Sequence, residues 1–270
     1  MSWARIMAPL SGGEEDVAAL AAAAVMAEPF DAEVAGVYTP ADLADLMPWM
    51  GEAFMGGVQA SALESLKEAS AVGGARAREA VERCPYRKVR YATLQTPVWA
   101  GLSAEGRLSD VVVFMDSASR GRGPLAESFQ QMVADEQRPV LIARPGLKTD
   151  GCVMVAWDGG KEASRAARLA LPLLEKASRV VIVFSPKSGA RNIDPTRLQD
   201  YYAQRGLNAE VEYLPSSGDV GHALLEAAGR AGAAILVAGA FGHPRLQEFI
   251  FGGTTRTLLN SDGPSLFLSH

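Results

Sequence analysis

Two glycine-containing segments in the second half of the chain carry side chains that can bind a phosphate or a ribose. One is Asp158-Gly159-Gly160, and the other runs from Gly239 through Gly242 and His243 to Gly252-Gly253-Thr254-Thr255. Glycines let backbone N–H groups approach phosphate oxygens, because no Cβ stands in the way. A helix N-terminus would add unpaired N–H donors and the positive end of its dipole. The threonine hydroxyls can donate hydrogen bonds to phosphate or ribose, and Asp158 can accept them from ribose or adenine. Taken alone, the same glycines favour tight turns, with Asp158 capping a helix and the threonines facing solvent.

The elements that position these segments are short apolar runs alternating with helical stretches. Unalternating apolar runs are typical of parallel strands buried on both faces, and the intervening stretches are long enough for crossover helices. The predicted strands are Cys152–Trp157, Arg179–Phe184, 209–214, 233–238 and 265–268, and the predicted helices are 162–176, 195–205, Val220–Ala231 and 246–260. Ligands of open α/β sheets bind beyond the carboxyl ends of the strands, where both segments fall.

An internal repeat extends this pattern to the first half. Residues 5–12 resemble 152–159, with Ser11 aligned with Asp158, and residues 110–113 align with 234–237. The spacing between the copies falls by about 22 residues along the chain, which places an insertion between Tyr38 and Val89. The repeat predicts two α/β domains, residues 1–146 and 151–270, each with a five-stranded parallel sheet and helices on both faces.

The spacing Gly-x2-Gly-x9-Gly at Gly239, Gly242 and Gly252 resembles the ATP-binding fingerprint of the universal stress protein family. Residues 251–256 look like the end of many tandem bacterial members, and Ala156-Trp157-Asp158-Gly159 resembles the family's opening strand. The resemblance covers nearly the whole chain as two copies. It implies a Rossmann-like fold of the adenine nucleotide alpha hydrolase type. It also implies a nucleotide site formed by Ala156, Asp158, Gly239, Gly242, His243, Gly252, Gly253, Thr254 and Thr255.

The sequence departs from the family pattern at one position of this site. The family places Ser or Thr directly after the third glycine, whereas this chain has Gly253, so a hydroxyl is missing unless Thr254 or Thr255 replaces it. In the first half the glycines themselves are lost, since Met115, Ala118 and Ser128 align with them. A nearby basic loop, residues 119–123, is either solvated or meets an anion. We therefore predict one nucleotide site per chain, in residues 151–270, and a degenerate first domain.

The resemblance also implies how the two domains meet. Family members commonly pair through their final strands, here residues 140–144 and 265–268, and a tandem chain can make this pairing internally as a pseudo-dimer. Such pairing would cover two sheet edges that otherwise invite aggregation.

The insertion around residues 39–60 is rich in methionine and large apolar side chains, most of them within 41–57. Such a surface suits a flexible partner or self-association. The alternative is a lid packed on its own domain.

Composition narrows the classes of partner. The net charge of -5 gives no electrostatic reason to expect nucleic acid. The longest apolar runs, residues 18–26 and 111–115, are too short to span a bilayer, and the start lacks the pattern of a signal peptide. Cys84 and Cys152 form no metal or disulfide framework, so a reducing cytoplasm fits best.

We therefore expect a cytoplasmic, non-enzymatic stress-response protein that binds ATP or another adenine nucleotide, with or without Mg²⁺. His222, His243 and His270 are scattered, and no catalytic constellation is evident. Two other functions remain open. A slow ATPase or nucleotide hydrolase of the same fold would use Asp158 or His243, and a ligand-free interaction scaffold would use the methionine-rich insertion.

Overall fold

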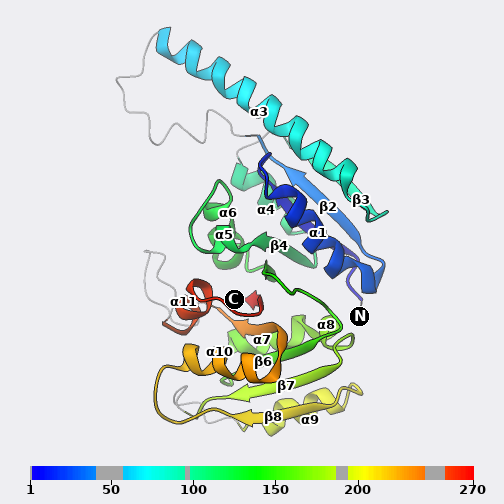
Figure 1. The fold of residues 1–270 in the computed structure, drawn as a ribbon, viewed down its shortest axis with the longest axis vertical. Coiled ribbons are helices and arrows are strands. Elements are labelled where there is room, and N and C mark those ends of the chain that lie inside the picture. Colours follow the sequence, from blue (N-terminus) through cyan, green and yellow to red (C-terminus); the bar gives the residue numbers. More distant parts are fainter. Residues whose placement is uncertain (1, 41–56, 95–97, 187–193, 241–252) are drawn as a thin grey trace.

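All described strands of the protein lie in one sheet. The computed structural model describes residues 2–40, 57–94, 98–186, 194–240 and 253–270. Its ten strands follow the order β3-β2-β1-β4-β5-β10-β9-β6-β7-β8 (Figure 1). The strands are β1 Arg5–Leu10, β2 Glu33–Tyr38, β3 Val89–Thr93, β4 Val111–Met115, β5 Val140–Ala143, β6 Cys152–Trp157, β7 Arg179–Phe184, β8 Ala209–Tyr213, β9 Ala233–Gly239 and β10 Ser265–Ser269.

The sheet is parallel except at its centre, where β5 and β10 pair antiparallel with Leu141 opposite Phe267. This pairing joins residues 1–146, the first half, to residues 151–270, the second half. The expected two five-stranded sheets are therefore continuous with one another, and the molecule contains one ten-stranded sheet. Within each half the strand order is the same, because β3-β2-β1-β4-β5 mirrors β8-β7-β6-β9-β10.

Helices cover both faces of this sheet, so the protein has three layers. The helices are α1 Asp16–Ala27, η1 Glu28–Phe30, α3 Gly57–Arg83, α4 Val98–Gly106, α5 Asp116–Ser119, α6 Ala126–Ala134, α7 Lys161–Leu169, α8 Leu171–Leu174, α9 Thr196–Ala203, α10 Val220–Ala231 and α11 Gly253–Asn260. One apolar core lies between the sheet and α1, α3, α7, α8 and α9. A second core lies between the other face and α4, α5, α6, α10 and α11. Both cores run through the two halves, which ties them together.

The predicted elements of the second half largely match the structure. The helix expected over 162–176 is divided into α7 and α8, because Pro172 lacks an N–H and starts a new helix more readily than it continues one. Only residues 253–260 of the helix expected over 246–260 are described. None of the described helices is both long and apolar enough to cross a membrane.

The described part of the insertion is one long helix. In Figure 1, α3 passes the outer strands of the first half, and its N-terminal end projects beyond them. Its C-terminal part buries Ala77, Ala80 and Val81 against the core. The methionine-rich residues 41–56 lie outside the described residues, so their predicted role as a partner surface or lid stays a prediction.

Candidate functional site

The strand order reverses at the same place in each half. In the second half the chain goes from β6 to β7 on one side and later returns to β9 on the other, and β6 pairs with both. Parallel neighbours end at the same edge of a sheet, and a crevice opens where the order reverses. Asp158 follows β6, and Gly239 is the last residue of β9. The structure thus brings Asp158 and Gly239, the first residues of the two predicted segments, to one switch point.

The loop after β6 is open to solvent. Asp158 is exposed, and its Oδ1 accepts a hydrogen bond from the Gly160 N–H at 2.7 Å. Gly159 has a φ of 74°, a left-handed conformation that favours glycine. The loop ends at Gly160, the N-cap of α7, so the helix begins directly beneath it. The second carboxylate oxygen, Oδ2, and the helix N-terminus are the polar groups that this loop presents.

Gly239 is required by packing, whatever ligand the site takes. A Cβ on Gly239 would lie 2.5 Å from the backbone nitrogen of Ala163 and 2.6 Å from the carbonyl carbon of Glu162. The end of β9 therefore meets the first turn of α7 at backbone distance. This close approach fixes the position of the β9 end of the crevice. It also explains why the first position of the motif is a glycine, because any side chain there would clash with α7.

The third predicted segment begins α11. Gly253 is the first residue of that helix and is exposed, Thr254 is partly buried, and Thr255 is 8% exposed. A Cβ on Gly253 would meet no atom of the described residues within 4 Å, so none of these residues requires glycine there. The remaining predicted site residues, Gly242, His243 and Gly252, lie outside the described residues.

Polar groups without partners also lie at this edge. Ala156, the remaining predicted residue, is partly buried near the end of β6. The next residue, Trp157, has a buried Nε1–H with no hydrogen-bond acceptor among the described residues, and the buried Ser269 Oγ at the end of β10 has none either. Two further polar side chains, a donor and a hydroxyl, therefore remain available at the carboxyl ends of the strands. Among the described residues, no group of three or more His, Cys, Asp or Glu could hold a metal ion.

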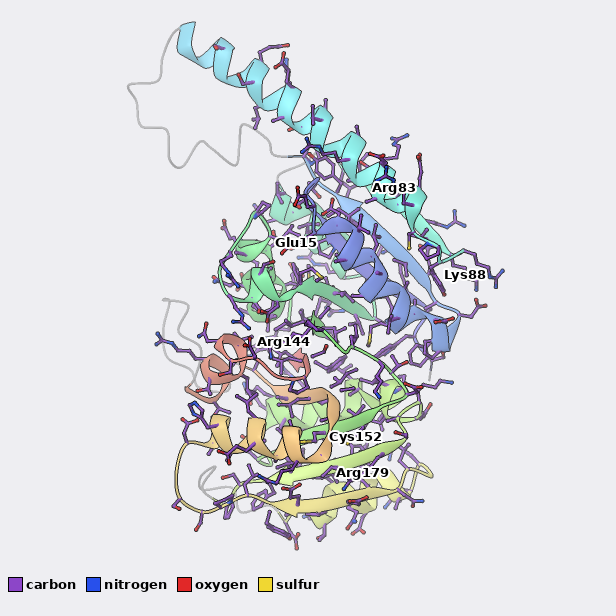
Figure 2. All side chains as sticks on the ribbon, viewed as in Figure 1. Glu15, Arg83, Lys88, Arg144, Cys152 and Arg179 are labelled. Carbon is purple, nitrogen blue, oxygen red and sulfur yellow. The ribbon has the colours of Figure 1, made fainter. Side chains whose placement is uncertain are left out.

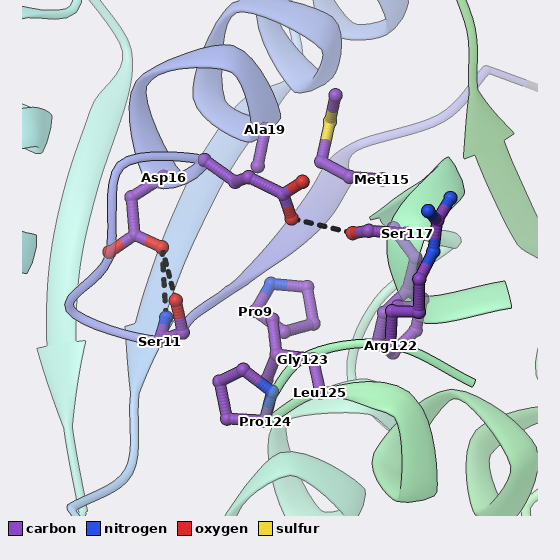
Figure 3. Close-up of a pocket in the computed structure, with 13 residues that line it drawn as sticks. Pro9, Ser11, Asp16, Ala19, Met115, Ser117, Arg122, Gly123, Pro124 and Leu125 are labelled. Atoms are coloured by element: carbon purple, nitrogen blue, oxygen red, sulfur yellow. Dashed lines mark hydrogen bonds between the residues drawn. The ribbon is translucent and has the colours of Figure 1, made fainter. Parts of the chain in front are cut away.

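The corresponding switch point of the first half, between β1 and β4, is filled by the chain's own carboxylate. Asp16, in the first turn of α1, is 2% exposed. Its Oδ1 accepts hydrogen bonds from the Ser11 N–H at 2.9 Å and the Ser11 hydroxyl at 3.1 Å, and its Oδ2 accepts one from the Gly12 N–H at 2.8 Å. Figure 3 shows Asp16 turned toward Ser11. The loop donors that could meet a phosphate already have an anion.

Helix α3 then seals this loop from outside. Gly12 has a φ of 74°, and a Cβ there would lie 2.5 Å from the Cα of Gly73. Gly73 in turn contacts the Tyr38 hydroxyl, which donates a hydrogen bond to the Ser70 carbonyl at 3.0 Å. Burial raises the pKa of Tyr38, with smaller contributions from Tyr91 and Asp16, so this phenol stays protonated and keeps donating. The glycine contact leaves no room for a ligand between the β1–α1 loop and α3.

A small cavity adjoins this loop, and a larger open one of about 550 Å³ lies next to it, beside α1 and the end of β5. The cavity at the ends of β1 and β4 has a volume of about 20 Å³, enough for roughly one water molecule. It is crossed by the Ser117 hydroxyl, which donates to Glu15 Oε2 at 2.6 Å. The adjoining basic loop, residues 119–123, has Arg120 bound to Asp116 and Asp262. That arginine forms ion pairs with carboxylates of the protein itself.

Sequence reasoning missed three of these residues. Asp16 is indistinguishable in sequence from a solvent-facing acid at a helix start, and only its position relative to the Ser11-Gly12 loop gives it a role. Arg144 and Asp116 form an ion pair at the junction of the halves, where Figure 2 labels Arg144. In the sequence, Arg144 is recognisable only as an arginine directly after an apolar strand. That position does not indicate its contacts until the strand register is known.

These features define the class of the protein. A largely parallel sheet with helices on both faces and glycine loops at the switch points belongs to the doubly wound α/β proteins. Within that class, the similar solved structures include universal stress proteins. One, from Archaeoglobus fulgidus, superposes with a TM-score of 0.68 at 13% identity, covering 98% of this chain and 95% of that chain.

A second similar structure is a putative universal stress protein from Pseudomonas aeruginosa. Its TM-score is 0.55 at 15% identity, and the match covers 99% of this chain and 93% of that chain. The chain therefore has the universal stress protein fold over nearly its whole length, in agreement with the resemblance of its motifs. No protein-family profile and no curated protein sequence matches it.

Proposed function

We propose that the chain is a universal stress protein that binds one adenine nucleotide, ATP or a related compound, at the β6–β9 switch point. In this proposal residues 1–146 and 151–270 are two copies of one nucleotide-binding domain, and the first copy is degenerate. The stress-response role, which is non-enzymatic, follows from the family resemblance. The loop geometry supports the choice of ligand.

The observation that carries the proposal is the difference between the two switch points. After β6 the loop is open and Asp158 is exposed. After β1 the equivalent loop is bonded to the buried Asp16 and covered by Gly73 of α3. The first half therefore commits its loop N–H groups to a buried internal carboxylate, whereas the second half presents an exposed carboxylate that a ligand can reach.

Each residue of the site has a chemical task in this proposal. Asp158 and the strand end at Ala156 hold the ribose and adenine. The N-terminal turn of α11, with Thr254 and Thr255, faces the phosphates. The loop between β9 and α11 supplies backbone donors at Gly242 and Gly252, and His243 contacts phosphate. A bound Mg²⁺ would be held chiefly by the phosphate oxygens.

Two measurements test the proposal. Mass spectrometry of purified, denatured protein should detect a retained adenine nucleotide, and calorimetry with ATP, with and without Mg²⁺, should give a stoichiometry near one per chain. Asp158→Ala should weaken binding by about tenfold, the effect expected from losing a hydrogen bond to a charged group. Ser11→Ala, at the equivalent position of the first half, is the matched control and should leave affinity unchanged. Two equivalent sites, or equal losses in both variants, would contradict the proposal.

A further inference from the structure

The C-terminal end of helix α11 is only partly capped by its own residues, with Asn260 Nδ2 donating to the Arg256 carbonyl at 3.0 Å. An α-helix leaves its last four carbonyl groups without intrahelical partners, and its dipole places negative partial charge there. Helix α11 has only eight residues, Gly253–Asn260, and no basic residue in its last turn. A cation from elsewhere is needed to stabilise this end.

Arg144 of the first half provides that cation. Its Nη2 donates to the carbonyl oxygens of Leu258 at 2.9 Å and Leu259 at 3.2 Å, and its Nη1 donates to the Pro264 carbonyl at 3.2 Å. The side chain is only 2% exposed. The antiparallel register of β5 and β10 places Arg144 beside Ser265, whose hydroxyl accepts the Arg144 N–H at 3.1 Å. Figure 2 shows Arg144 at the junction of the two halves.

Asp116 holds this arginine in place. Its Oδ1 lies 2.7 Å from Arg144 Nε, and its Oδ2 lies 2.6 Å from Arg120 Nε. Arg120 then reaches back to Asp262, just beyond α11, at 2.8 Å. A buried guanidinium without a carboxylate partner would be strongly destabilising, so Asp116 makes the buried cap tenable.

The position of Asp116 shows that this contact exists in only one of the two halves. Asp116 directly follows β4, the strand that corresponds to β9, so it stands in the first half's version of the candidate phosphate loop. There Met115 replaces Gly239. By strand alignment, Ser269 stands where Arg144 stands in the first half. The second half therefore has no equivalent arginine, and the contact acts from the first half on the second only.

We propose that Arg144, held by Asp116, is a positioning residue for the nucleotide site of the second half. The inference rests on the proposed function. Helix α11 is about 12 Å long, so a contact that fixes its last turn also fixes the direction of its first turn. That first turn carries Gly253, Thr254 and Thr255. The segment after β4 in the first half thus no longer has the glycines of a ligand loop. Through Asp116 and Arg144, it instead orients helix α11 of the second half.

The test uses the full-length protein and four variants. Arg144→Gln removes the charge and shortens the side chain to a polar amide, and Arg144→Lys keeps the charge without the forked donors. Asp116→Asn leaves the arginine but weakens its hold. Arg179→Gln is the matched control, because Arg179 is also an ion-paired arginine, bound to the exposed Glu210 at the opposite end of the strands. ATP affinity is measured by calorimetry, and hydrogen exchange is followed for the amides of α11.

We expect Arg144→Gln to weaken ATP binding by about tenfold and to speed exchange in α11 while exchange in β6 and β7 stays unchanged. Arg144→Lys should recover part of the affinity, Asp116→Asn should show a smaller loss, and Arg179→Gln should behave as wild type. If Arg144→Gln does not fold, Asp116→Asn carries the test alone. Wild-type affinity in both Arg144→Gln and Asp116→Asn overturns the inference only. Absence of ATP binding by the wild-type protein overturns the proposed function and the inference with it.

Discussion

Gly253 is the position where adding one side chain should improve the proposed site. The universal stress protein pattern that the motif of this chain resembles has Ser or Thr at this position. The substitution Gly253→Ser supplies that hydroxyl. The described residues leave room for it, because a Cβ on Gly253 would meet none of their atoms within 4 Å. Gly253 also has no positive φ, so a serine there causes no backbone strain. The change therefore adds a donor without displacing a neighbour.

The expected gain follows from the strength of one charge-assisted hydrogen bond. Hydrogen bonds to charged groups contribute about 1.5–3 kcal/mol net. Thr254 and Thr255 already offer hydroxyl groups nearby, and the new serine loses rotamer freedom on binding, so the low end applies. A gain of about 1.4 kcal/mol corresponds to roughly tenfold tighter binding of ATP.

The assay is calorimetric titration of Gly253→Ser with ATP, beside the control Gly229→Ser. Gly229 is also an exposed helical glycine, in α10, and a Cβ there would likewise meet no atom within 4 Å. Replacing a helical glycine by serine stabilises a helix by about 0.5 kcal/mol in either place. Both variants should therefore melt at slightly higher temperature than wild type, while only Gly253→Ser should bind ATP more tightly. Equal affinities in the two variants would refute the placement of phosphate at the start of α11.

Two further predictions concern the joined halves and their stability. Trp3 is 6% exposed and stacks on Phe267 of the second half at a centroid distance of 6.0 Å, so Trp3→Ala should lower the free energy of unfolding by about 3–5 kcal/mol in urea titrations. A loss below about 1 kcal/mol would mean that this contact does not join the halves. Arg107 donates to Glu136 and holds the pKa of that carboxyl below its ordinary value of 4.5. Stability from this pair is present above pH 4.5 and is lost as pH falls through the folded-state pKa, so wild type should lose more stability on acidification than Glu136→Gln. Parallel losses in the two proteins would exclude that contribution.

Much of the fold could be predicted because buried parallel strands have a simple sequence signature. Runs such as Val153–Val155 in β6 and the strand β9 are apolar on both sides, since helices cover both faces of the sheet. The repeat then gave the first half by alignment. The division of the 162–176 helix was missed, although Pro172 was visible, because a proline can also kink a continuous helix.

The candidate site was less predictable, because several of its properties depend on contacts between distant segments. Gly239 was expected to face a ligand, and the structure adds a packing reason that needs the position of Glu162. The sealing of the first half by Gly73 lies in the insertion, where no repeat guides alignment. Arg144 could be recognised only after β5 and β10 were paired, because their register brings it to Leu258.

The contrast between the halves depends on where one carboxylate stands. By the repeat, Ser11 corresponds to Asp158 and Asp16 corresponds to Ala163. In the first half the acid is Asp16, the first residue of α1, where it accepts the loop N–H groups and is buried. In the second half it lies just after the strand end and is exposed, and the helix has Ala163 where the first half has Asp16. An N–H group that already donates to an internal carboxylate cannot also donate to a phosphate. The internal carboxylate therefore stabilises the loop and excludes phosphate from it. Asp16→Ala would remove the competing anion, yet Gly73 would still cover the loop at backbone distance, so two independent changes separate the first half from a nucleotide-binding state.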